Sequence, residues 1–247
     1  MSGFEFILYE KEGPIAWITL NRPKALNAVN IRMRDELYEV LPAIDDDPDV
    51  RVGIVKGAGE RAFSAGADIS EFGTAPSQAI AREVRWERDL WGRFLSVRKP
   101  LVAAIHGYAL GAGIEMAMCC DIRIASEEAT FGLPEANLGM IPTAGGSQTM
   151  PRLVGPGPTL EMVLTADRID AQEALRIGLV NLVVPRERLL PTAEEVARRL
   201  ASYDERALRY AKQAVARGLD MPLPQALEME RTLALALARE KGGETGD

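Results

Sequence analysis

The sequence has few of the residues that metal, disulfide and nucleic-acid sites require. Its 247 residues include one histidine and two cysteines, and its formal net charge is −7. His106 and the adjacent pair Cys119 and Cys120 lack the spacing of metal ligands, and cysteines in such an apolar segment are typical of buried thiols. A negative chain also disfavours nucleic acid, because phosphate binding needs clustered lysine and arginine. We therefore expect neither a metal site nor a nucleic-acid partner.

Long hydrophobic runs are also scarce. The stretch long enough to cross a bilayer, residues 101–120, contains His106, Glu115 and three glycines. An internal glutamate is costly in lipid, so a buried strand, turn and helix is the better interpretation. The first residues lack the basic segment and apolar core of a secretory signal. We expect a cytoplasmic protein with no membrane partner.

The chain does contain alternating strand and helix signals. Residues 4–9 and 15–20 predict a hairpin around a Gly-Pro turn. Asn30 is expected to cap a helix whose apolar positions follow at helical spacing up to Ile44. Further strands are predicted at residues 50–55, 101–105, 120–125 and 179–184. Such alternation is typical of an α/β domain.

Helix signals dominate the last third of the chain. Patterns of the capping-box kind begin at Asp170, Thr192 and Ser202. A long helix is also predicted earlier, at residues 77–97, with Ile80, Val84, Trp91 and Leu95 among its apolar positions. We divide the chain into an α/β core with the active site, residues 1–185, and a helical C-terminal region, residues 186–247.

Two acids stand in unusually apolar surroundings. Glu115 is expected in the first turn of a short helix, and Glu135 follows Pro134 between apolar residues. Each has an ordinary explanation, as a helix N-terminal acid or as a loop carboxylate. Nearby, however, residues 64–68 and 111–113 form loops of small residues whose backbone N–H groups can approach an oxyanion. Two buried acids and two such loops are what proton transfer next to a carbonyl group requires.

Two other motif readings are weaker. Residues 57–62 fit the glycine spacing of a dinucleotide-binding turn, but a loop follows where a helix should begin. Residues 62–66 lack the first glycine of a nucleophile elbow, and His106 is the only histidine available as a base. We therefore expect Ser64 to be a loop hydroxyl and His106 to be structural.

Several motifs occur together in one order along the chain. They are NRPKALNA (21–28), AFSAGADI (62–69), GYALGAGIEMA (107–117, extending to Asp121), FGLPE (131–135), LGMIP (138–142) and AGGSQ (144–148). In this combination, which runs to about Val184, the chain resembles the enoyl-CoA hydratase/isomerase (crotonase) superfamily. The resemblance implies a spiral core of repeated β-β-α units. A helical C-terminal trimerisation region should follow, here shorter than in many members.

The resemblance also implies a reaction and its residues. The substrate is an acyl-CoA thioester, and coenzyme A is part of it, so neither a metal nor a redox cofactor is expected. The thioester oxygen should lie between the N–H groups of Ala67 and Ala112. Glu135 should exchange the Cα proton, Glu115 should activate the water that adds at Cβ, and the amide of Thr143 should help to hold that water. The residues implied in coenzyme A binding are Lys24, Ala25, Leu26, Ala65, Ala67, Asp68 and Ile69.

Together these expectations predict an enoyl-CoA hydratase that adds water reversibly, with syn geometry, to a trans-2-enoyl-CoA and gives a 3-hydroxyacyl-CoA. Family members form trimers that often pair into hexamers, so a homo-oligomer is expected. Other reactions of the fold stay open: a double-bond isomerase, an acyl-CoA hydrolase or a decarboxylase. A non-catalytic coenzyme A-binding member also stays open, whereas the acidic charge disfavours an RNA-binding one.

Overall fold

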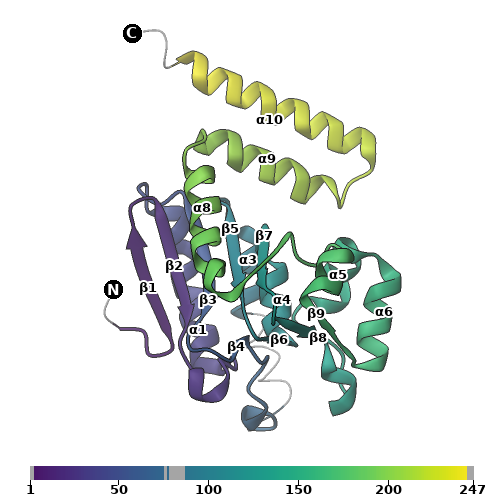
Figure 1. Cartoon of the computed structure of the whole chain (residues 1–247). Coiled ribbons are helices and arrows are strands. Elements are labelled where there is room, and N and C mark those ends of the chain that lie inside the picture. The colour runs from purple at the N-terminus through teal and green to yellow at the C-terminus, as the bar shows by residue number, and fades with distance from the viewer. Residues whose placement is uncertain (1–2, 75–76, 78–86, 244–247) are drawn as a thin grey trace.

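An α/β core carries a pair of long helices on one side (Figure 1). The computed structural model describes residues 3–74, 77 and 87–243. Within these residues, the larger sheet has six strands in the order β1 (Ile7–Glu12), β2 (Ile15–Leu20), β3 (Val52–Gly57), β5 (Leu101–Ile105), β7 (Ile122–Ser126) and β10 (Leu182–Val184). The smaller sheet has four, in the order β4 (Ala62–Ser64), β6 (Tyr108–Leu110), β8 (Thr130–Gly132) and β9 (Arg168–Asp170).

Successive strands alternate between the two sheets. β3, β5 and β7 lie in the larger sheet, and each is followed by a short strand, β4, β6 or β8, in the smaller one. A helix follows each pair: α3 (Leu90–Ser96), α4 (Ala112–Met118) and α5 (Gly146–Val154). Strands of successive units pair in parallel: β3 with β5, β5 with β7, and β6 with β8. By contrast, β1 and β2 form an antiparallel hairpin before α1 (Ile31–Asp46). The repeated β-β-α units predicted from the resemblance are confirmed.

Both faces of the larger sheet are covered. For this reason β2 and β5 are buried along their whole length, as central strands of covered parallel sheets are. Ile18 and Leu20 share one hydrophobic core with Leu37 of α1. Trp17 and Ile54 face the other side, where the second core includes Val196 of α8 (Leu189–Ala201). Although α8 belongs to the predicted C-terminal region, it closes the core.

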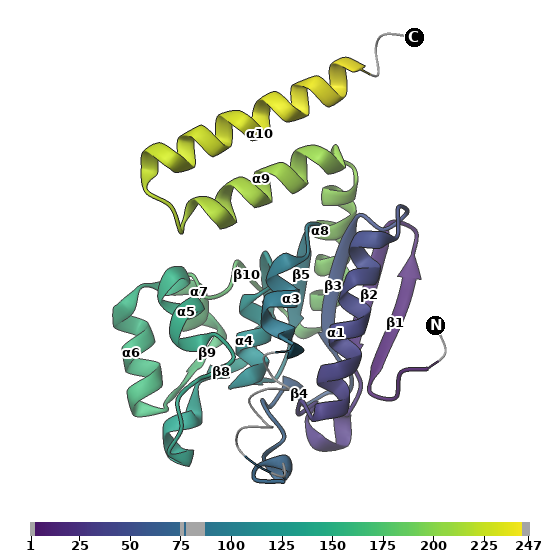
Figure 2. The ribbon, with the colours of Figure 1, turned by 180° about the vertical axis from the view of Figure 1, so that it is seen from behind.

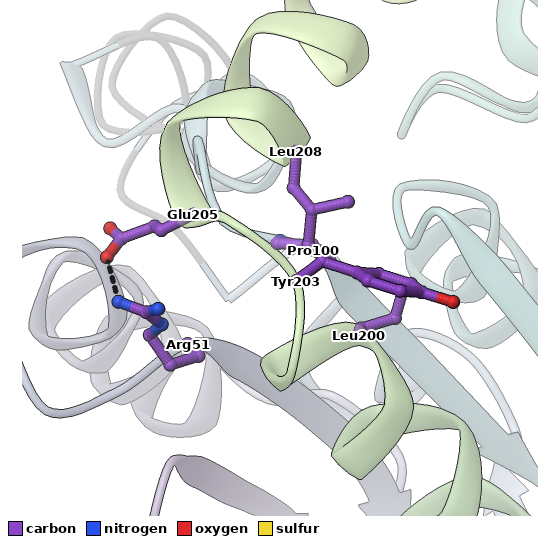
Figure 3. A pocket seen from close by; sticks show the side chains of 6 residues that line it. All are labelled: Arg51, Pro100, Leu200, Tyr203, Glu205 and Leu208. Carbon is purple, nitrogen blue, oxygen red and sulfur yellow. Dashed lines mark hydrogen bonds and ion pairs between the residues drawn. The ribbon is translucent and has the colours of Figure 1, made fainter. Parts of the chain in front are cut away.

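The last two helices form a hairpin beyond the sheets. α10 (Leu223–Gly243) packs along α9 (Glu205–Gly218), and both ribbon views place α10 outermost, with α9 between it and the core (Figure 2). At the start of α9, Glu205 accepts a hydrogen bond from Arg51 at 2.9 Å beside Pro100, Leu200 and Tyr203 (Figure 3). No helix in the described part of the chain is both long and apolar enough to cross a membrane.

Several expected elements match the structure closely. Asn30 caps α1 by accepting the Met33 N–H at 2.8 Å, and β2 and β5 have the expected bounds. The remaining helices of the described residues are α6 (Pro156–Thr165) and α7 (Ala171–Arg176), with short 3-10 segments η1 (Pro23–Ala25), η2 (Ile69–Glu71), η3 (Pro134–Leu138) and η4 (Arg186–Arg188).

Of the predicted helix at residues 77–97, the structure describes residues 77 and 87–97. Within it, α3 begins at Leu90 after the Asp89 cap, and its buried positions are Leu90 and Phe94. Leu95, expected among its apolar positions, is exposed, so that assignment is wrong. Ile80 and Val84 lie outside the described residues.

Candidate active site

The turn from β6 into α4 places Glu115. β6 lies between β4 and β8 in the smaller sheet, and the Gly111 N–H donates to the carbonyl oxygen of Gly132 at 2.9 Å. Gly111 then adopts φ 49° and ψ −125°, which a residue with a Cβ rarely adopts, and the chain enters α4. Glu115 follows in the first turn, where its side chain is buried.

Backbone amides at the start of α5 hold the Glu115 carboxylate. Its Oε1 atom accepts the N–H of Ala144 at 3.0 Å and that of Gly146 at 2.7 Å. Gly146 is the first residue of α5, so the carboxylate lies where helix N–H groups lack partners within the helix. A carboxylate fixed in this way keeps one orientation. The amide of Thr143, expected to hold water, belongs to the preceding residue, and its role stays a prediction.

The space around Gly146 gives a direct test of this arrangement. A Cβ atom added there would lie 2.8 Å from Oε1 of Glu115 and 2.9 Å from Cβ of Pro142. We expect Gly146→Ala to move the carboxylate and to lower kcat roughly 10–100-fold, because small misplacements of catalytic groups are costly. Steady-state kinetics measure this, with Gly157→Ala as control, since Gly157 lies in α6 with nothing within 4 Å of an added Cβ. Equal loss in both variants would contradict it.

Glu135 lies against the turn that precedes α4. It lies in η3, just after β8, and an added Cβ at Gly111 would come within 2.7 Å of its Oε1 atom. Among the described residues, its buried Oε2 atom has no hydrogen-bond partner. Burial raises the pKa of this carboxyl above its usual value. The two predicted acids therefore have unlike surroundings: the Glu115 carboxylate is held by amides at the start of α5, and the Glu135 carboxyl is desolvated beside Gly111.

The loop before η2 lies against the same turn. Gly66 has φ 104°, and an added Cβ would lie 2.9 Å from the Leu110 carbonyl oxygen and 3.6 Å from the Ala112 nitrogen. A side chain is excluded there, and the two loops touch through backbone. Ala112 is the first residue of α4, so its N–H has no acceptor within the helix.

An isolated bridge orients the amide of Ala67. Val29 pairs with Ala67 in parallel: the Val29 N–H donates to Gly66 at 2.8 Å, and the Val29 carbonyl accepts the Asp68 N–H at 3.0 Å. In a parallel bridge, the residue opposite these bonds turns its own N–H away from the partner. The structure thus brings together both predicted donor loops, those of Ala67 and Ala112.

The residues expected to bind coenzyme A gather beside this bridge. Lys24 and Ala25 form part of η1, and Leu26 accepts the N–H of Ala65 at 2.9 Å through its carbonyl oxygen. Asp68 caps η2, and Ile69 begins it with an exposed side chain. The segment with residues 24–26 and the segment with residues 65–69 are therefore neighbours in space, as a shared ligand would require.

The sequence matches the enoyl-CoA hydratase/isomerase family model over residues 10–246. The chain belongs to this family. Among curated relatives it is 42% identical to the crotonyl-CoA hydratase of Syntrophomonas wolfei, over 98% of this chain and 94% of that protein. It is 44% identical to the short-chain-enoyl-CoA hydratase of Clostridium acetobutylicum, over 91% of this chain and 86% of that protein.

Solved structures agree with this assignment to the enoyl-CoA hydratase/isomerase family. The crystal structure of an enoyl-CoA hydratase from Bacillus anthracis superposes with a TM-score of 0.90 at 37% identity, over 95% of this chain and 92% of that one. A structure from Geobacillus kaustophilus, described as enoyl-CoA hydrates subunit I, gives a TM-score of 0.92 at 40% identity, over 99% and 94%. The predicted crotonase-like fold is confirmed.

In this family member, the serine of the weaker nucleophile-elbow reading and the two cysteines have structural roles. Ser64 lies in β4, where its buried hydroxyl donates to the Asn27 carbonyl at 2.8 Å and accepts the Gly66 N–H at 3.3 Å. Cys119 and Cys120 are buried free thiols, and burial raises the pKa of both. No group of three potential metal ligands occurs in the described ranges.

His106 is buried, and its position predicts a pH effect on stability. Burial, assisted by Arg186, lowers its pKa from 6.5 to about 4. Between these values the unfolded chain binds a proton that the folded protein does not, so stability falls as the pH falls. We expect about 2–3 kcal/mol to be lost from this group by pH 4. The free energy of unfolding of wild type and of His106→Gln is measured with urea from pH 7 to pH 4. An equal loss of stability in the two proteins over this range would contradict the role of His106.

The amides of Ala144 and Gly146 are site residues that sequence reasoning missed. The sequence predicts a turn into a helix at residues 141–147 and shows the family pattern at residues 144–148, but it does not show what these amides bind. The paired glycines before an amphipathic helix are a sequence signal for an anion site, because the start of such a helix offers free N–H groups. Nothing local, however, names Glu115 as their acceptor, since 29 residues separate it from Ala144.

Proposed function

We propose that this protein is an enoyl-CoA hydratase, which adds water reversibly to a trans-2-enoyl-CoA and gives a 3-hydroxyacyl-CoA. The observation that carries the proposal is the contrast between two acids: Glu115 in the first turn of α4, and Glu135 against Gly111, which precedes that helix. Glu115 is oriented by two amides, and Glu135 is desolvated with a buried oxygen that has no partner among the described residues. Family membership and relatives named as hydratases support the same reaction.

In the proposed mechanism, the thioester oxygen accepts the N–H groups of Ala67 and Ala112. These donors stabilise the negative charge that develops on this oxygen as Cβ is attacked. Glu115 removes a proton from water, and the resulting hydroxyl adds to Cβ on the face that the fixed carboxylate presents. Glu135, whose raised pKa favours its protonated form, donates a proton to Cα. Both groups add from one side of the substrate, which gives syn addition.

The rest of the site follows from this assignment. The Thr143 amide would help to hold the attacking water, and the segments with residues 24–26 and 65–69 would bind coenzyme A. Hydration transfers a proton and a hydroxyl group and needs no external oxidant or reductant, so we propose no cofactor beyond the coenzyme A of the substrate. Assembly as a trimer or hexamer and a cytoplasmic location stay predictions.

Crotonyl-CoA provides the test. We expect the absorbance of the conjugated enoyl thioester to fall when the protein is added, and chromatography to show 3-hydroxybutyryl-CoA. Free coenzyme A would instead indicate a hydrolase, and 3-butenoyl-CoA an isomerase. Coenzyme A binding without turnover of any enoyl-CoA from four to sixteen carbons would indicate a non-catalytic member and would overturn the proposal.

A further inference from the structure

The side chain of Arg22 connects the two segments that meet at Ala67. Its Nη1 atom donates to the Ala28 carbonyl at 2.5 Å, and its Nη2 atom donates to Oδ2 of Asp68 at 2.9 Å. The guanidinium lies over the ring of Phe6, 5.0 Å from its centroid, and is largely buried. Ser70 and Arg22 hold the pKa of the Asp68 carboxyl below its usual value. Charge-assisted bonds of this kind are stronger than neutral ones.

These two acceptors lie on opposite sides of the Val29–Ala67 bridge. Ala28 precedes Val29, and Asp68 follows Ala67, so Arg22 crosses from one strand of the bridge to the other. Val29 makes two backbone hydrogen bonds in the bridge, and the Ala65 N–H adds a third between the same two segments by donating to the Leu26 carbonyl at 2.9 Å. At the end of this short pairing, where Ala67 lies, the two charge-assisted contacts of Arg22 join the residue before Val29 to the residue after Ala67 and so help to fix the register. That register determines the direction of the Ala67 N–H.

Arg22 is itself held in place. Its N–H donates to Oδ1 of Asn27 at 2.9 Å, and the buried Asn27 amide group donates to the carbonyls of Ala58 and Ala62. Phe6, whose ring lies beneath the guanidinium, donates its backbone N–H to the buried Glu36 carboxylate at 2.8 Å. An arginine anchored at both its backbone and its stacking partner can hold Asp68 at a fixed position.

We infer that Arg22 is a positioning residue for the proposed reaction and acts by aiming the Ala67 N–H at the thioester oxygen. The inference rests on the proposed function. It predicts that Arg22→Met lowers kcat roughly 10–100-fold, since losing one oxyanion donor altogether costs about 10²–10³-fold. The KM for crotonyl-CoA should change less than kcat. Asp68→Asn, which removes the charge of the acceptor, should act in the same direction with a smaller effect.

The test compares kinetics with the polarisation of a bound thioester. A chromophoric arylacryloyl-CoA absorbs further to the red when hydrogen bonds polarise its carbonyl oxygen. We expect the red shift on binding to be reduced in Arg22→Met and in Asp68→Asn, and to be partly restored in Arg22→Lys. A variant that only loosened the fold would lose bound probe without changing the spectrum of what remains bound.

Arg51→Met is the matched control. Arg51 bonds Glu205 at the same distance of 2.9 Å, but it precedes β3, whereas Ala58, which contacts Asn27, follows that strand (Figure 3). The six residues of β3 therefore separate Arg51 from Ala58, and from the contacts of Asn27, by about 20 Å. We expect this variant to keep the wild-type red shift and kcat. Wild-type values in folded Arg22→Met and Asp68→Asn would overturn the inference. Absence of hydration by the wild type would instead overturn the proposed function.

Discussion

Glu135→Gln is expected to lower kcat for crotonyl-CoA hydration by roughly 10³–10⁴-fold, the upper part of the range for loss of a general acid or base. Glutamine keeps the size of the side chain and cannot exchange a proton with Cα. Burial raises the pKa of the Glu135 carboxyl, which suits a group that must be protonated when hydration begins. The measurement is kcat by stopped-flow and steady-state absorbance.

The control for Glu135→Gln is Glu161→Gln. Glu161 lies exposed on α6, which packs against η3, so this variant makes the same chemical change near the same segment. It should keep wild-type kcat. Both variants should bind butyryl-CoA, a saturated analogue that cannot be hydrated, as tightly as wild type. A Glu135→Gln enzyme that retains more than about a tenth of kcat would exclude Glu135 as the proton donor, because general acid–base groups contribute at least about 10²-fold.

Glu115→Gln is expected to lower the kcat of hydration about as much as Glu135→Gln does. Unlike that variant, it should still exchange the protons at Cα. The glutamine oxygen can still accept the N–H groups of Ala144 and Gly146, so the start of α5 keeps its contacts. Without the carboxylate, water is no longer deprotonated, and kcat should fall roughly 10³–10⁴-fold. Glu135 is untouched and should still remove a proton from Cα.

Exchange of the Cα protons of butyryl-CoA in ²H₂O separates the two roles. We expect Glu115→Gln to exchange them at a rate within about tenfold of wild type, less than the loss expected for a missing general base. Glu135→Gln should not exchange them. Wild-type hydration by Glu115→Gln would contradict the assigned roles, because Glu135 alone would then be sufficient for hydration.

Local patterns were sufficient where an element depends on its own residues. β5 consists of five consecutive buried apolar residues, and α1 begins at a cap that Asn30 forms with Met33. The three-residue strands β4, β6 and β8 were missed, because segments so short show no periodicity and exist only through pairing with each other.

Of the three predicted helix caps, only the one at Asp170 is found at the predicted residue. Asp170 caps α7 as predicted, by accepting the Glu173 N–H at 2.8 Å. Thr192, however, lies inside α8, which begins at Leu189 after the turn η4. Ser202 follows the end of α8, and Asp204 caps α9. Packing of α8 on the larger sheet, which the sequence does not show, selects the helix start there.

The candidate site divides in the same way. The two acids were identifiable because a glutamate in an apolar run requires an explanation, and the structure buries Glu115 in the first turn of α4 and places Glu135 against Gly111. The Ala144 and Gly146 amides and the contacts of Arg22 were not identifiable, since each joins residues far apart in the sequence. Arg22 and Asp68 are 46 positions apart, and neither belongs to a local pattern that names the other.

Hydration of crotonyl-CoA in ²H₂O, followed by NMR of the product, tests the central claim most directly. The proposed mechanism predicts 3-hydroxybutyryl-CoA with one deuterium at Cα, on the same face as the new hydroxyl group, because Glu135 and Glu115 act from one side. A deuterated alkene without a hydroxyl group, a product of anti addition, or release of free coenzyme A would contradict it.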